Sequence, residues 1–211
     1  MPETAAALDK FTIMLFGLRW LHFIFGIIWI GLLYFFNFVN GPFVKILDAN
    51  TKKIVIPQLM PRALWWFRWG AMITFLSGWI YIIGKLQLNS TGLTGAGGLL
   101  TSTWGQWIAT GAILGSIMWF NVWFIIWPAQ KKLIAWTKKG ESPAEMAGLT
   151  KKAFLASRLN TYLSFPMLFC MGAASHLPAF NLVYVLVAVV VSIVLVWHLV
   201  NKVAGKVGSN F

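Results

Sequence analysis

The sequence predicts an all-α integral membrane bundle of about five transmembrane helices, with the N-terminus outside and the C-terminus cytoplasmic. Of the 211 residues, 59% are hydrophobic and only 10% are charged, and the mean hydropathy is +0.75. Apolar stretches long enough to cross a hydrocarbon layer of about 30 Å recur along the chain. The charges are concentrated in the segments between these stretches. We therefore expect residues 1–211 to form a single transmembrane domain without a soluble domain.

The first apolar stretch covers residues 18–39 and is expected to be a retained helix. No basic segment precedes it, no small-residue cleavage site follows it, and it contains Arg19 and His22, which is unlike a signal peptide. The other four stretches cover residues 64–84, 104–127, 156–176 and 181–201. The third contains GAILG, in which Gly111 and Gly115 would let a neighbouring helix approach closely, within the chain or in an oligomer.

The basic residues between the helices predict the orientation, because Lys and Arg prefer the cytoplasmic side. The segments after the first and third helices and the C-terminal tail are rich in them: Lys45, Lys52, Lys53, Arg62, Lys131, Lys132, Lys138, Lys139, Lys151, Lys152, Arg158, Lys202 and Lys206. We expect a multi-pass protein of the cell inner membrane. The net charge of +12 matches this sorting and an attraction to anionic headgroups of the lipid bilayer, so no nucleic-acid partner is predicted.

The predicted membrane segments contain no carboxylate. The five acidic residues fall in the N-terminal tail and the two basic loops: Glu3, Asp9, Asp48, Glu141 and Glu145. This distribution disfavours proton-coupled or sodium-coupled transport, di-iron clusters and a Ser/His/Asp site within the membrane. Cys170 is the only cysteine, which excludes an internal disulfide and a CxxCH haem attachment, and we expect it to be a small buried residue.

Three histidines remain as candidate functional residues of the membrane segments. At ~1.5 Å per residue, His22 lies about 6 Å below the outer surface, His176 closes the fourth helix at the outer edge, and His198 lies about 24 Å deeper than the outer start of the fifth helix. Two imidazoles at similar depth, among aromatic and small residues, favour a b-type haem with His22 and His176 as its iron ligands. Arg19 could pair with a haem propionate or simply extend to the interface, and Met171 is an alternative axial ligand.

Four long strings resemble the N-terminal membrane domain of the bacterial membrane-bound urate oxidase (urate hydroxylase) family. They are RWLHFIFGIIWIGLLYFFNFV, LMPRALWWFRWGAMITFLSG, IMWFNVWFIIWPAQKK and ASRLNTYLSFPMLFCMGAASH, in the family's order over about residues 15–177. The resemblance implies a membrane location, haem association and, in members with the full architecture, electron transfer from urate to a C-terminal cytochrome c domain. This chain ends at Phe211 without such a domain. We therefore expect a separate cytochrome c or another redox partner.

Three functional hypotheses follow from these features. The leading one is a haem-b electron-transfer protein, and any enzyme activity would be that of an oxidoreductase of the urate oxidase type. The first alternative is a channel or transporter that uses polar residues on the cytoplasmic side. These residues are Arg62, Arg68, Asn121, Arg158 and Asn160. Their Arg and amide donors could also hold an anionic purine or a quinone headgroup. The second is a structural subunit of a respiratory membrane complex that packs through the GAILG face. A larger membrane complex with stoichiometric partners would favour the structural subunit, whereas a homogeneous homo-oligomer would count against it.

Overall fold

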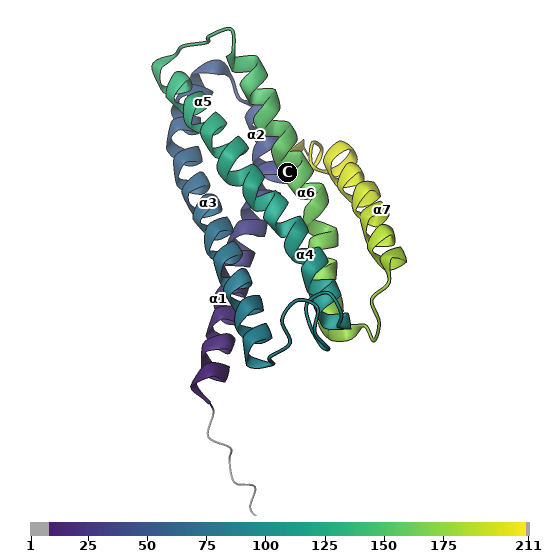
Figure 1. The fold of residues 1–211 in the computed structure, drawn as a ribbon. Coiled ribbons are helices and arrows are strands. Elements are labelled where there is room, and N and C mark those ends of the chain that lie inside the picture. Colours follow the sequence, from purple (N-terminus) through teal and green to yellow (C-terminus); the bar gives the residue numbers. More distant parts are fainter. Residues whose placement is uncertain (1–8, 210–211) are drawn as a thin grey trace, which may run out of the picture.

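The computed structural model describes residues 9–209, and all the regular structure within that range is helical. Five long helical runs alternate in direction (Figure 1). They are α1 (Lys10–Tyr34) with the π-helical segment η1 (Phe35–Asn40) and α2 (Gly41–Ile46); α3 (Ala49–Leu88); α4 (Thr103–Phe120) with the π-helical segment η2 (Asn121–Ile126) and α5 (Trp127–Lys139); α6 (Met146–His176); and α7 (Leu182–His198) with η3 (Leu199–Val203), followed by the short turn η4 (Val207–Ser209).

The predicted all-α membrane bundle is confirmed. Four helical runs of the described chain are long and apolar enough to cross a membrane, namely Lys10–Ile46, Ala49–Leu88, Thr103–Lys139 and Leu182–Val203. The fifth, α6, is 31 residues long and lies alongside them in contact with both α4 and α7. It is less apolar because its first half contains Lys151, Lys152 and Arg158, and because it carries buried Asn160, Thr161 and Ser164. The orientation of the bundle in the membrane stays a prediction.

The helices extend well beyond the predicted apolar stretches into the two segments that we expected to be loops. Residues 41–46 and the first part of α3 are helical, and so are α5 and the first part of α6. Pro57 and Pro61 lie inside α3 without ending it. Asp48 begins α3 by accepting hydrogen bonds from the backbone amides of Asn50 and Thr51 at 2.8 and 3.1 Å. The expectation of long loops was wrong because hydropathy marks where a helix enters lipid, whereas the caps determine where it ends.

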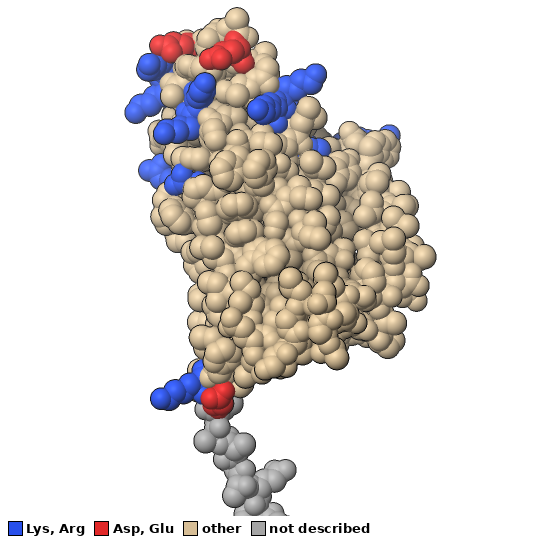
Figure 2. Space-filling model, viewed as in Figure 1, with Lys and Arg blue, Asp and Glu red and all other residues tan. Residues whose placement is uncertain are grey.

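The charged side chains are separated along the bundle as the sequence predicts. Figure 2 shows Lys and Arg gathered at the end where α5 and the first turns of α3 and α6 lie, with a broad uncharged band on this face below them. The four described acids lie outside the apolar stretches: Asp9 precedes α1, Asp48 caps α3, and Glu141 and Glu145 lie between α5 and α6. Glu3 lies outside the described residues.

Helices α1 and α3 pack along their length, as do α4 and α6, and α7 packs mainly on α6. The close approach predicted at GAILG is confirmed within the chain, because a Cβ added at Gly111 would lie 2.9 Å from Cε of Met171 and 3.2 Å from Cβ of Cys170. Cys170 is fully buried, as expected. The α1–α3 and α4–α6 pairs meet over a core around Leu33, Phe67 and Met118.

Candidate functional site

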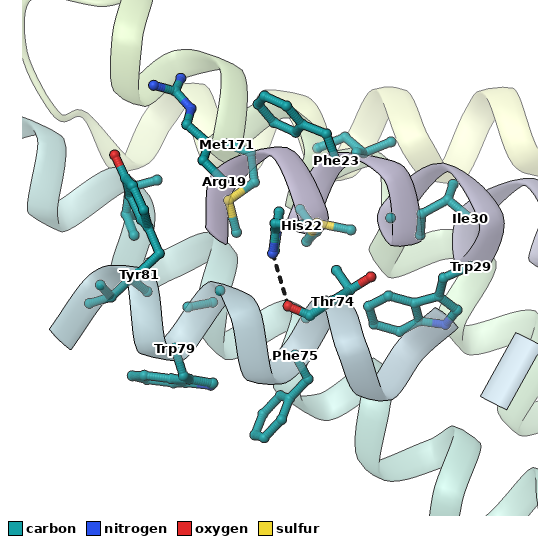
Figure 3. A pocket seen from close by; sticks show the side chains of 18 of the residues that line it. Arg19, His22, Phe23, Trp29, Ile30, Thr74, Phe75, Trp79, Tyr81 and Met171 are labelled. Atoms are coloured by element: carbon teal, nitrogen blue, oxygen red, sulfur yellow. Dashed lines mark hydrogen bonds between the residues drawn. The ribbon is translucent and has the colours of Figure 1, made fainter. Parts of the chain in front are cut away.

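A cavity of about 840 Å³ lies between α1, α3, α4 and α6, within the size range of ligand-binding pockets. Its walls are largely apolar, and the residues that form them include Phe23, Trp29, Ile30, Phe75, Trp79, Ile82, Trp104, Ile108, Met167 and Met171. Small residues on three of the four helices, Gly26, Gly31, Gly78, Ala112 and Gly115, also line it. Figure 3 shows this cavity from close by. The small residues provide space between helices that are otherwise closely packed.

His22 projects from α1 into the wall of this cavity (Figure 3). Its Nδ1 lies 2.9 Å from the backbone carbonyl oxygen of Thr74 on α3, so Nδ1 carries the proton and donates it to that oxygen. In the neutral ring Nε2 then keeps its lone pair, and none of the described hydrogen bonds engages it. A histidine held in this way has the arrangement that commonly orients an imidazole toward a metal.

Gly78 on α3 provides the room for the His22 ring. A Cβ added at Gly78 would lie 2.9 Å from both Cε1 and Nδ1 of His22, closer than carbon and nitrogen atoms can pack. The position of His22 therefore depends on two features of α3, a carbonyl acceptor at Thr74 and a missing side chain one turn later.

Two cations, Arg19 and Lys85, line the cavity. Arg19 comes one turn before His22 on α1, and its guanidinium lies 5.6 Å from the centroid of Phe23. Lys85 comes from the last part of α3, and its ammonium lies 3.7 Å from the centroid of Trp104. Among the described residues the only ion pair joins Lys139 and Glu141, so neither cation is paired with a carboxylate. The cavity can therefore accept an apolar molecule that carries negative groups at one end.

Lys85 is a site residue that the sequence did not single out. The second apolar stretch ends at residue 84, whereas α3 continues to Leu88 and includes Lys85. Antiparallel packing could have indicated Lys85 from the sequence, because the end of the second helix lies beside the start of the first helix, where Arg19 is found.

The structure places His176 outside the lining of the cavity. It is the last residue of α6, it is exposed, and its Nδ1 lies 2.8 Å from the carbonyl oxygen of Gly172 in the same helix. The part of α6 that lines the cavity is Met167, Leu168, Met171 and Ser175. At 3.6 residues per turn, His176 points about 140° away from Met171 around the helix axis. The structure thus brings Met171, and not His176, to the cavity that holds His22, and iron ligation by His176 stays a prediction.

His198 is exposed at the end of α7 and does not line the cavity. Within residues 9–209, no three side chains of His, Cys, Asp or Glu converge on a position that could hold a metal ion.

Three of the polar residues expected on the cytoplasmic side have hydrogen-bond partners within the chain. Asn121 and Asn160 are buried and satisfy each other, with Nδ2 of Asn121 donating to Oδ1 of Asn160 at 2.7 Å and Nδ2 of Asn160 donating to the carbonyl of Met118 at 2.9 Å. They tie α4 and η2 to α6. Arg62 is exposed and donates to the carbonyl of Gln58 on its own helix. The transporter hypothesis stays a prediction.

The fold and the cavity define the class of this protein: a multi-pass α-helical membrane protein with a ligand-sized cavity between its helices, a histidine on the cavity wall and two cations beside it. The model of the urate oxidase N-terminal family matches residues 97–207, just over half of the chain, and the chain belongs to this family. The match runs from the loop before α4 through η3 and includes Met171 and His176, whereas His22 and Arg19 lie outside it. No curated protein and no solved structure matches the chain.

Proposed function

We propose that this protein is a haem-b redox protein of the cell inner membrane, the membrane part of a urate oxidase that passes electrons to a cytochrome c. The observation that carries the haem proposal is His22, held by Thr74 on the wall of an apolar cavity of about 840 Å³. Haem b bound there would supply reversible one-electron exchange.

The residues around the cavity fit such a group in three respects. The hydrogen bond from Nδ1 to Thr74 orients the His22 ring and makes Nε2 a better donor to iron. The walls are apolar and aromatic, as a macrocycle requires. Arg19 and Lys85 are unpaired with carboxylates and could each hold a propionate. Arg19 keeps the role suggested by the sequence, and Lys85 joins it.

Two residues of α6 are candidates for the second axial position. Met171 is supported by its place on the cavity wall. His176 is supported by the stronger affinity of imidazole for haem iron, although the last turn of α6 would have to rotate to bring it in. We rank Met171 first on the geometry, and the optical spectrum separates the two.

Urate as the substrate is supported by family membership alone, because none of the described contacts identifies a purine site. Oxidation of urate releases electrons, and a separate cytochrome c or another redox partner would accept them. The test is urate consumption by membranes that contain the protein, with and without added cytochrome c. Absence of consumption in both would remove urate as substrate and leave the haem proposal standing.

The haem proposal is tested by the absorption spectrum of protein purified from cells supplied with haem. We expect a Soret band in the wild type and in the His198→Ala variant, and its loss or a change to a high-spin form in the His22→Ala variant. A folded wild-type protein without a Soret band would refute the proposal.

A further inference from the structure

Arg68 on α3 lies in a cluster of tryptophans and does not line the cavity that holds His22. Its guanidinium carbon lies 4.0 Å from the ring centroid of Trp127, 5.2 Å from that of Trp123 and 5.7 Å from that of Trp69. Trp127 begins α5 and Trp123 lies in η2, so the cluster joins α3 to the continuous run of α4 and α5. Such stacking holds the guanidinium plane in one orientation.

The hydrogen-bond donors of this cluster are incompletely satisfied. Nε of Arg68 and Nε1 of Trp123 are buried and have no hydrogen-bond partner. The ion pair of the described residues, Lys139 with Glu141, lies elsewhere, so Arg68 has no carboxylate partner either. This cation and these two donors are partly removed from water and have no anion beside them. Their desolvation costs free energy, which a hydrogen-bond acceptor from outside the chain would offset.

The position of Arg68 along α3 indicates where such an acceptor would come from. Arg68 and Lys85 are separated by roughly 26 Å at ~1.5 Å per residue, close to the thickness of a hydrocarbon layer. A membrane with one headgroup layer at Lys85 would therefore have its other headgroup layer near Arg68, on the side of the bundle toward which Lys and Arg gather (Figure 2). Three tryptophans beside it, Trp65, Trp66 and Trp69, are 47%, 51% and 38% exposed. An apolar aromatic surface next to an unpaired cation fits a molecule with both a phosphate and acyl chains.

We propose that Arg68, with Trp123 and Trp127, forms a binding site for the phosphate of an anionic phospholipid. The guanidinium donates to the phosphate oxygens from a plane fixed by the tryptophan rings, and the acyl chains lie along the exposed tryptophans of α3. The residues of this site do not line the cavity, so the test of this proposal is independent of the test of the haem proposal.

The test measures lipid retained by the purified protein, using native mass spectrometry after exchange into mixed phosphatidylglycerol and phosphatidylcholine. Arg62→Gln is the matched control, because Arg62 is on the same helix, is exposed and bonds only within its own helix. We expect the wild type and Arg62→Gln to retain phosphatidylglycerol in preference to phosphatidylcholine. We expect Arg68→Gln to retain about ten-fold less phosphatidylglycerol, the loss of one charge-assisted contact. Equal retention by the two variants would overturn the proposal.

Two further measurements cover the other outcomes. If Arg68→Gln cannot be recovered folded, Arg68→Lys is compared with Arg62→Lys, because lysine keeps the charge but loses the stacked planar fork. A several-fold lower retention in Arg68→Lys alone supports the site, and equal retention overturns it. Inorganic phosphate is the second arm. If it raises the melting temperature of the wild type as much as phosphatidylglycerol vesicles do, the site takes a soluble anion and the lipid assignment is wrong.

Discussion

Nδ1 of His22 on α1 lies 2.9 Å from the backbone carbonyl oxygen of Thr74 on α3. This bond joins residues 52 positions apart in the sequence and fixes which nitrogen of the imidazole carries the proton. It also leaves Nε2 as the nitrogen with a free lone pair, on a residue that lines the cavity (Figure 3). The predictions about ligand binding start from this relationship.

The first prediction concerns the ligand from α6. We expect Met171→Ala to change the spectrum of the bound haem and to remove a thioether-to-iron charge-transfer band, because Met171 lines the cavity. His176→Ala should leave that spectrum nearly unchanged, because His176 is exposed and points away. Absorption and magnetic circular dichroism of the two variants provide the measurement. Loss of the low-spin form in His176→Ala alone would establish the histidine pair instead.

The second prediction concerns Gly78. Its replacement by alanine would place a methyl group 2.9 Å from the His22 ring, so the ring must move and its bond to Thr74 must weaken. We expect a destabilisation of about 1–3 kcal/mol and a lower affinity for haem, measured by thermal unfolding and haem titration. Gly17→Ala on α1 is the control, because no heavy atom lies within 4 Å of a Cβ added there. Equal haem affinities in both variants would contradict the packing described for His22.

The third prediction concerns the two cations of the cavity. Arg19→Gln and Lys85→Gln should each speed the dissociation of a haem by about ten-fold, because each removes one charge-assisted contact to a propionate. Transfer of haem to apomyoglobin measures the rate. Lys10→Gln is the comparison, since Lys10 is exposed and does not line the cavity. If the rate of haem dissociation increases in Arg19→Gln but not in Lys85→Gln, the anionic group lies only on the α1 side.

The fourth prediction concerns the contact between α4 and α6. Gly111→Val should lower the melting temperature in detergent, because even the first added carbon would lie 2.9 Å from Cε of Met171 and 3.2 Å from Cβ of Cys170. The cost expected from overpacking is about 1–3 kcal/mol. Gly172→Val is the control, because a Cβ there meets no heavy atom within 4 Å. If both variants unfold at the same temperature, close packing at Gly111 is unimportant for stability.

The fifth prediction concerns orientation. The end of the bundle rich in Lys and Arg should face the cytoplasm, because these residues are retained on that side during insertion. A cysteine at Thr94, in the exposed loop between α3 and α4, should react with a membrane-impermeant maleimide in intact cells. A cysteine at Ser142, between α5 and α6, should react only after lysis. The reverse labelling pattern would show that the bundle has the opposite orientation in the membrane.

Several features of the bundle follow from the sequence alone. The five helical segments, the uneven charge and the close approach at Gly111 depend on local composition, and each is found in the structure. The sequence also singled out His22 and Arg19, because polar residues within hydrocarbon are few and costly. Both line the cavity. The predictions of helices, charge distribution and close packing succeed because hydropathy, charge and small-residue spacing act over one helix or one turn, whereas the ligand roles of His22 and Arg19 stay predictions.

The tertiary structure decided which side chains meet. The helical rise of about 1.5 Å per residue gives the depth of a residue from the sequence. Which neighbouring helix or cavity its side chain faces depends on how the helices pack. His176 and Met171 lie near the same end of α6, yet only Met171 lines the cavity. Lys85 joins Arg19 there because α3 runs antiparallel to α1 and continues past its apolar stretch. The cavity itself arises from glycines and alanines on different helices, and their alignment is fixed by packing between segments far apart in the chain.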